Sequence, residues 1–192
     1  VVLGPEIGQC CGGTVTVRIE PVTDLARLER EVVAAMEQRP HFYLFGAGHV
    51  GRALTRALAM LPLRVVWIDS RPDSFGSVPD GVEIRITGDW ATVLAEAPAG
   101  SSVIVMTQSH ALDALIIADA LERGDFRYVG LIGSMTKRRR FEQEFRALGM
   151  DDERIARLVC PLGGTTDDKR PECIAALVAA EIVMRCLKPT VS

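Results

Sequence analysis

The sequence has little histidine and no paired-cysteine motif. It contains three histidines and five cysteines, with no C-x-x-C pair among them. So few histidines leave little scope for general acid–base catalysis, and we find no Ser/His/Asp arrangement and no His-rich metal spacing. An odd number of cysteines without that motif fits neither a disulfide framework nor a zinc ribbon, so we expect reduced thiols. The composition therefore favours binding over catalysis.

Long apolar runs and an excess of positive charge are also missing. No apolar stretch reaches the roughly 18 to 20 residues that span a bilayer, and no basic-then-apolar leader is present. We therefore expect a cytoplasmic protein without a membrane partner. A formal charge of −3 gives no broad attraction to nucleic acid. The local exception is the run Lys137-Arg138-Arg139-Arg140, which predicts either a solvated helix face or a contact with an acidic partner.

Short apolar runs do occur, and from residue 41 onward they alternate with helical patterns. The runs are HFYLF (41–45), RVVWID (64–69), EIRIT (83–87), SVIVMT (102–107) and YVGLI (128–132). Strands separated by helices build right-handed βαβ units, and continuously apolar strands are covered on both faces. The pattern predicts an α/β fold with a doubly wound parallel sheet of the Rossmann-like kind. A C-terminal helix is expected over Pro171 to Cys186.

The first 40 residues follow a different pattern. The stretch GGTVTVRIEPV (12–22) alternates polar and apolar side chains, as an edge or appended strand does. An apolar stripe of Leu25, Leu28, Val32 and Met36 then predicts a helix that ends before Pro40. We therefore expect a strand-helix appendage over residues 1–40 and a Rossmann-like domain with its C-terminal helix over residues 41–192.

The loop after the first apolar run is Gly46-Ala47-Gly48-His49-Val50-Gly51, which fits G-x-G-x-x-G. In that pattern the first glycine permits a tight turn, the second lets the backbone approach a pyrophosphate, and the third lets the helix pack on the strand. Asp69 ends the second run, where a ribose hydroxyl is met, and the nearby Arg71 leaves the preference for a 2′-phosphate open. The loop predicts a phosphate or pyrophosphate site, and the alternative is a glycine turn that only packs.

A polar loop also follows the fourth apolar run. Ligands bind beyond the carboxyl ends of parallel strands, which makes Thr107, Gln108 and His110 candidate ligand contacts. The same residues have a simpler explanation, in which Ser109 or His110 caps the next helix and Asp113 favours its dipole. The residues alone do not decide between these two explanations.

Two features lie further along the chain. Gly133 and Ser134 open a helix that carries the basic run, which predicts either a second anion site or a capped helix. Glu181 lies on the expected apolar stripe of the last helix, formed by Ile174, Leu177, Val178 and Ile182. A carboxylate there needs a partner or a task, and we favour local pairing.

Two stretches combine cysteine with a pair of glycines: Cys10-Cys11-Gly12-Gly13 and Cys160-Pro161-Leu162-Gly163-Gly164. Thiolates suit thiophilic metals, whereas a buried cysteine ordinarily acts as a small apolar side chain. The residues by themselves favour the apolar role at both places, with Cys10 and Cys11 kept as metal candidates.

Six motifs in one order resemble the xanthine dehydrogenase accessory protein family of the XdhC/CoxI type. They are GQCCGG (8–13), FGAGHVGRAL (45–54), WIDSRPDSF (67–75), TQSHALD (107–113), GLIGSMTKRRRF (130–141), and CPLGG with KRPECIAALVAAEIV (160–183). The resemblance implies a chaperone that binds molybdenum cofactor (molybdopterin) and protects it while a cysteine desulfurase-type sulfurase installs the terminal sulfur. The chaperone then delivers the cofactor to a xanthine dehydrogenase-like molybdenum hydroxylase.

By the same resemblance, Cys10 and Cys11 become cofactor contacts, and the glycine loop with His49 and Asp69 becomes the phosphate cradle. Family members usually carry a further domain before GQCCGG, so we expect this chain to be a C-terminal part or a short form. Gln108 also stands where many relatives have histidine. Two alternatives stay open: an NAD(P)-dependent oxidoreductase and a nucleotide-sensing regulatory domain. Neither predicts the CCGG stretch, and a homodimer is compatible with every interpretation.

Overall fold

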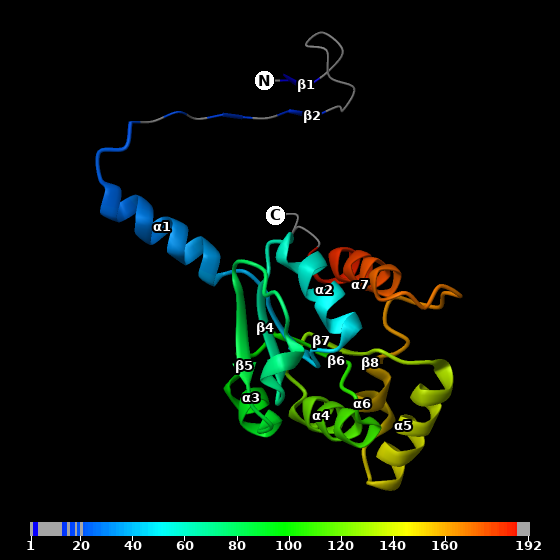
Figure 1. Cartoon of the computed structure of the whole chain (residues 1–192). Coiled ribbons are helices and arrows are strands. Elements are labelled where there is room, and N and C mark those ends of the chain that lie inside the picture. Colours follow the sequence, from blue (N-terminus) through cyan, green and yellow to red (C-terminus); the bar gives the residue numbers. More distant parts are fainter. Residues whose placement is uncertain (1, 4–12, 15, 18, 20, 188–192) are drawn as a thin grey trace. The chain divides into compact units, whose positions relative to one another are not determined.

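The structure, a computed structural model, describes residues 2–3, 13–14, 16–17, 19 and 21–187. Its contacts divide the chain into two units, Val1–Glu37 and Gln38–Ser192 (Figure 1). In the first unit, strand β1 (Val2–Leu3) pairs antiparallel with strand β2 (Gly13–Thr14), and helix α1 spans Leu25–Glu37.

The described part of the expected strand over residues 12–22 is strand only at Gly13–Thr14. Val17 and Ile19 are exposed, so the period-two pattern marks no buried face at these positions. The helix was predicted correctly, and Asp24 caps it by accepting a hydrogen bond of 2.9 Å from the Arg27 amide. The apolar stripe of α1 is exposed.

The second unit contains, among the described residues, a six-stranded parallel sheet in the order β5-β4-β3-β6-β7-β8. The strands are β3 (His41–Phe45), β4 (Arg64–Asp69), β5 (Val82–Ile86), β6 (Ser102–Val105), β7 (Tyr128–Leu131) and β8 (Leu158–Val159). Within this unit the sheet begins at the central strand β3 and extends outward through β4 to β5. The chain then returns to the centre at β6 and extends in the other direction through β7 to β8. This confirms the predicted doubly wound fold and puts the reversal of strand order between β3 and β6.

Helices cover both faces of the sheet (Figure 1). On one face lie α2 (His49–Ala59) and α7 (Pro171–Cys186), and on the other lie α3 (Trp90–Glu96), α4 (His110–Arg123), α5 (Met135–Ala147) and α6 (Asp152–Ala156). A short 3-10 helix, η2, spans Pro72–Ser74. Side chains alternate along β3, so that Phe42 and Leu44 pack under α2 and α7 while Tyr43 and Phe45 pack toward α4. The sheet is thus apolar on both faces, and polar groups are concentrated at its ends.

The C-terminal helix has the predicted bounds, but the residues that it buries differ in part from the predicted apolar stripe. Ala175, Val178, Ile182 and Cys186 are buried, whereas Leu177 is 40% exposed. Both stripes follow helical spacing, and packing against α2 selects the one that contains the smaller Ala175. No helix in the described ranges combines the length and the apolar character needed to cross a membrane.

Glu181 on this helix pairs locally, as we favoured. Its carboxylate accepts hydrogen bonds from the Tyr128 hydroxyl at 3.0 Å and the Gly163 amide at 2.6 Å, and it forms an ion pair with Arg185. Burial and the neighbouring Glu181 charge raise the pKa of Tyr128. The carboxylate therefore ties α7 to β7 and to the loop after β8.

Candidate functional site

The glycine loop joins β3 to α2 at the carboxyl edge of the sheet. Gly46 has a φ of +118°, and a Cβ there would lie 2.4 Å from the Met106 carbonyl oxygen. A Cβ at Gly51 would lie 2.2 Å from the Gly46 oxygen, whereas one at Gly48 would meet nothing within 4 Å. Gly46 and Gly51 are thus required by the turn and by the packing of α2, while Gly48 leaves its backbone open to close approach.

The start of α2 also differs from the starts of its neighbours. Gly48 is the N-cap residue and supplies no side-chain cap, whereas Ser109 caps α4 and Ser134 caps α5. The first N–H groups of a helix have no partner within the helix and carry partial positive charge. Those of α2 are therefore suited to an anion.

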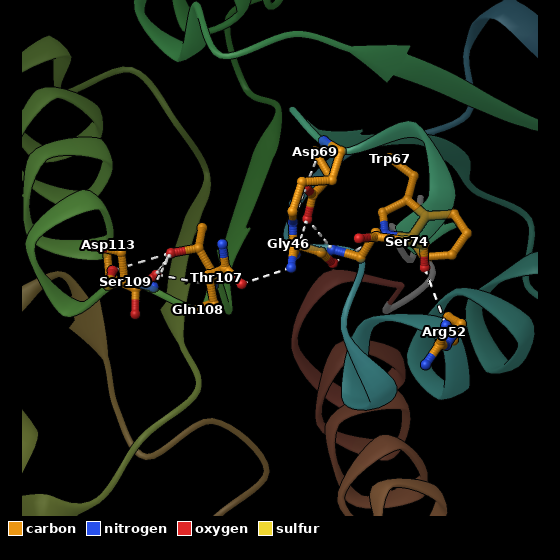
Figure 2. Close-up of polar contacts among 11 residues, drawn as sticks. Gly46, Arg52, Trp67, Asp69, Ser74, Thr107, Gln108, Ser109 and Asp113 are labelled. Atoms are coloured by element: carbon orange, nitrogen blue, oxygen red, sulfur yellow. Dashed lines mark hydrogen bonds and ion pairs between the residues drawn. The ribbon is translucent and has the colours of Figure 1, made fainter. Parts of the chain in front are cut away.

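Asp69, at the end of β4, forms hydrogen bonds with the glycine loop and with Arg71. Its Oδ2 accepts hydrogen bonds from the Ala47 amide at 2.7 Å and from Arg71 Nη2 at 2.8 Å (Figure 2). Its Oδ1 accepts from the Arg71 amide at 3.0 Å and from Arg71 Nε at 2.9 Å. Burial opposes ionisation of Asp69, but these hydrogen bonds outweigh it and lower the pKa of the carboxyl.

Four hydrogen bonds fill the acceptor sites of this carboxylate, and its side chain is 6% exposed. The expected contact between Asp69 and a ribose hydroxyl would therefore need Arg71 or Ala47 to leave. In this arrangement Asp69 organises the loop, because one side chain holds both the glycine-loop backbone and an arginine.

Arg71 continues from Asp69 to the loop after β6. Its Nη1 donates a hydrogen bond of 2.6 Å to Gln108 Oε1, which we call the Arg71–Gln108 bridge (Figure 2). Since β3 lies between β4 and β6, this bridge crosses the carboxyl end of β3, where the glycine loop begins. Sequence reasoning noted Arg71 without giving it a contact, and the short spacing from Asp69 was the signal that could have found the ion pair.

Arg71, Thr107 and Gln108 line two cavities. The main cavity, about 480 Å³, is lined on its other sides by Ala47 to Arg52 and by Ser74, Met106 and Ile132. The narrow cavity, about 60 Å³, extends toward β5 and α3 and includes Asp69 and Trp90. Pockets for small molecules usually have roughly 300 to 1,000 Å³, so the main cavity alone of these two is large enough for a cofactor.

Among the residues that the structure describes, the lining of the main cavity includes basic side chains and no carboxylate. Arg52 and Arg71 line it together with His49, and Arg52 is held by a hydrogen bond of 3.3 Å from its Nη1 to the Ser74 carbonyl (Figure 2). The N-terminus of α2 adds partial positive charge at Gly48. The chemistry of this lining suits a phosphate or pyrophosphate group.

The loop after β6 uses its polar groups internally. Asp113, fully buried, accepts hydrogen bonds from the Thr107 amide at 2.9 Å and the Thr107 hydroxyl at 2.7 Å. Lys137 Nζ lies 2.6 Å from its other oxygen. Ser109 caps α4, as the simpler explanation had it, and His110 is exposed and lines neither cavity. Thr107 and Gln108 are the residues of this loop that the structure brings to the main cavity.

The basic run on α5 is largely paired. Lys137 pairs with Asp113, Arg138 with Glu142, and Arg140 with Glu144, while Arg139 is exposed. Arg138 also donates to the Cys160 carbonyl at 3.0 Å. The positive face that the sequence suggests is therefore mostly neutralised within the helix and its surroundings.

Gly133 and Ser134 line a third cavity of about 470 Å³, which we call the adjoining cavity because it shares Ile132 with the main cavity. It lies between the start of α5, the loop after β8 and α7. Ser134 serves as the α5 cap, accepting a hydrogen bond of 3.2 Å from the Lys137 amide. The capped-helix interpretation of this pair is thus correct, and a ligand contact stays a prediction.

The cysteine candidates divide into two groups. Cys160 is buried, and burial raises the pKa of its thiol, which fits the role of a small apolar side chain. Cys10 and Cys11 lie outside the described residues. Within the part of the chain that the structure describes, no group of three or more His, Cys, Asp or Glu side chains could hold a metal ion.

Comparison with known proteins gives three findings. A family model described as the XdhC Rossmann domain matches residues 42–182, from β3 to α7. The chain is 28% identical over 181 residues to "Uncharacterized protein YqeB" of Escherichia coli (strain K12), covering 92% of this chain and 30% of that protein. It is similar to a crystal structure of a xanthine dehydrogenase from Bacillus halodurans, with a TM-score of 0.65 and 26% identity over 80% of this chain and 45% of that one. The chain thus spans less than half the length of either relative.

Proposed function

The chain belongs to the XdhC Rossmann domain family, and from this premise we propose that it binds molybdenum cofactor by its phosphate group. That family is related to xanthine dehydrogenase maturation. In this proposal the chain holds molybdopterin while a cysteine desulfurase-type sulfurase acts on it, and it then passes the cofactor to a xanthine dehydrogenase-like molybdenum hydroxylase. The chain is an assembly chaperone that performs no reaction of its own.

The observation that carries the proposal is the main cavity. Molybdopterin carries a phosphate, and its dinucleotide form carries a pyrophosphate. Gly48 allows the backbone to approach such a group, and Arg52 and Arg71, which line the same cavity, supply guanidinium donors. When bound, the cofactor supplies the molybdenum centre, and the residues of this chain bind and orient its phosphate end.

The alternative of an NAD(P)-dependent oxidoreductase or a nucleotide-sensing domain uses the same loop, but two observations weigh against it. The Asp69 carboxylate already accepts four hydrogen bonds. The narrow cavity, which lies beyond β4 and β5 where a nucleoside binds in dinucleotide folds, has only about 60 Å³. Both favour a ligand that is held by phosphate without its ribose being recognised.

The test replaces Gly48 with valine. Gly48 has extended backbone angles and no neighbour around a Cβ, so the variant should fold, at a cost below about 1 kcal/mol for the changed N-cap. A valine side chain blocks the approach of phosphate to the α2 amides, and we expect molybdopterin affinity to fall at least about tenfold. Retention of molybdopterin by the purified chain measures this.

The matched control is Gly88→Val. Gly88 lines the narrow cavity, and the nearest atom to a Cβ there is 3.9 Å away, so this variant adds the same side chain at the same edge of the sheet. It should bind molybdopterin like the unmodified chain. Unchanged affinity in a folded Gly48→Val variant contradicts the proposal, as does an equal loss in both variants.

A further inference from the structure

We infer that Arg71 is the residue that grips the ligand phosphate in the main cavity, and that Asp69 is its positioning residue and does not bind a ribose. Gln108 holds the guanidinium when no phosphate is bound. The inference rests on the proposed function and deepens it, because it gives the site its specificity: the site recognises a phosphate or pyrophosphate ester and does not read a ribose hydroxyl.

The donors of Arg71 are the first argument. A guanidinium has five N–H groups, and among the described residues three of those of Arg71 find a partner, two toward Asp69 and one toward Gln108, which leaves two. Breaking the Arg71–Gln108 bridge frees one more. A phosphate oxygen is a stronger acceptor than the neutral Gln108 amide oxygen, since its bonds to guanidinium are charge-assisted, so the exchange favours phosphate.

The position of Arg71 is the second argument. Asp69 pairs with one side of the guanidinium through Nε and Nη2 and so fixes its plane. The same carboxylate accepts from the Ala47 amide, so the guanidinium has a fixed position relative to the glycine loop. To bind a ribose, Asp69 must give up charge-assisted hydrogen bonds worth about 1.5 to 3 kcal/mol each.

Charge is the third argument. Asp69 offsets the charge of Arg71, so Arg71 contributes directed hydrogen bonds more than long-range attraction. Arg52 also lines the main cavity, and its guanidinium donates to the neutral Ser74 carbonyl, so it provides a net positive charge. The two arginines therefore have separable roles, with Arg52 attracting the phosphate and Arg71 orienting it.

The shape of the site is the fourth argument. Beyond the Arg71–Gln108 bridge, the narrow cavity offers about 60 Å³, which is too little for a nucleoside. In the other direction the main cavity shares Ile132 with the adjoining cavity of about 470 Å³. A ligand whose phosphate lies at Arg71 therefore has room for its organic part toward the start of α5 and α7, away from the ribose position.

The experiment uses the purified chain and isothermal titration with four probes: inorganic pyrophosphate, ADP, 2′-deoxy-ADP and adenosine 2′,5′-bisphosphate. We expect the unmodified chain to bind ADP and 2′-deoxy-ADP with affinities within about twofold, because no side chain reads the 2′-hydroxyl. Arg71→Gln should weaken pyrophosphate binding at least about tenfold. Arg56→Gln is the matched control, because Arg56 lies on α2, is exposed and does not line the main cavity.

Asp69→Asn separates a positioning role from ribose binding. If Asp69 positions Arg71, the variant weakens pyrophosphate and ADP by the same factor. If Asp69 binds ribose, it weakens ADP alone and leaves pyrophosphate unchanged, which overturns the inference. Arg71→Lys serves where Arg71→Gln fails to fold, since it keeps the charge but loses the two-point pair with Asp69, and it should lose most of the pyrophosphate affinity.

Two further results discriminate between the inference and its premise. If the unmodified chain binds neither pyrophosphate nor ADP, the phosphate site of the proposed function is wrong and the inference falls with it. If the chain binds pyrophosphate and Arg71→Gln binds it equally well, the inference alone is overturned. A loss in Arg71→Gln confined to adenosine 2′,5′-bisphosphate also overturns it, because Arg71 then reads a 2′-phosphate.

Discussion

The glycine loop after β3 and the polar loop after β6 meet at one edge of the sheet and use their polar groups in opposite ways. Around the glycine loop, Arg71 and the uncapped start of α2 line the main cavity, and Arg71 has two N–H groups without a partner among the described residues. In the loop after β6, the Thr107 amide, the Thr107 hydroxyl and the Lys137 ammonium all bond to the buried Asp113. Polar residues at the end of a strand therefore indicate a ligand site only where their hydrogen bonds are not already made within the protein.

The largest effect is expected at Asp113. Replacing it with alanine leaves Lys137 mostly buried without its countercharge and removes the partner of the Thr107 amide. Breaking a buried pair in this way costs about 3 to 5 kcal/mol of unfolding free energy, which denaturant titration measures. The control is the double variant Asp113→Leu with Lys137→Met, which should recover the part of the loss that comes from the unpaired Lys137 charge. A cost below about 1 kcal/mol for Asp113→Ala would contradict the statement that the polar groups of the loop after β6 mainly stabilise the fold.

The next largest effect is expected from substitutions of Gly46, Gly48 and Gly51, which should distinguish the glycines needed for stability from the one needed for binding. Gly46→Ala and Gly51→Ala place a Cβ 2.4 Å and 2.2 Å from carbonyl oxygens, and we expect each to cost about 1 to 3 kcal/mol of stability. Gly48→Ala should stay within about 1 kcal/mol of the unmodified chain while phosphate affinity falls. Thermal melts of the three variants check the order, and equal melting temperatures contradict the assignment of structural and ligand-facing glycines.

The smallest effect is a change in pH dependence at Asp69. Its pKa is lowered in the folded chain, so the carboxylate contributes stability that is fully present above the unfolded pKa, near 4, and is lost as the pH falls through the folded value. Asp69→Asn removes that contribution. Unfolding free energies measured between pH 6 and 3 should fall less steeply for this variant. An identical slope means that the ion pair with Arg71 is too weak to position it.

The fold was largely predictable because βαβ units are regular. The five predicted runs all contain strands, since each has four or more consecutive residues bounded by turn or capping residues. Strand β8 was not predicted, because its two residues give no period to detect. The prediction for residues 12–22 was wrong in the other direction. The alternation of polar and apolar residues predicts a strand over this stretch, but among its described residues only Gly13–Thr14 form one. A periodic pattern shows which side chains of a segment could form a buried face. Whether that face is buried depends on the tertiary contacts that the segment makes.

The candidate site was predictable only where the signal is local. Glycine spacing identified the loop, and the apolar setting of Glu181 correctly indicated a need for partners. The Arg71–Gln108 bridge joins residues 37 positions apart, and the Lys137–Asp113 pair joins residues 24 positions apart. Such contacts follow from strand order, which brings the ends of β4, β6 and β7 together, and no local pattern encodes them.

The two tryptophans make the carboxyl edge of the sheet accessible to intrinsic fluorescence measurements. The sequence has two, and both lie there. The Trp67 indole donates a hydrogen bond of 3.0 Å to the Gly46 carbonyl beneath the glycine loop (Figure 2). Trp90 lines the narrow cavity. Indole emission depends on local polarity and hydrogen bonding. Intrinsic fluorescence of the unlabelled chain is therefore a direct reporter of loop rearrangement and ligand occupancy, with Trp67→Phe and Trp90→Phe assigning the change to the two sides of the bridge.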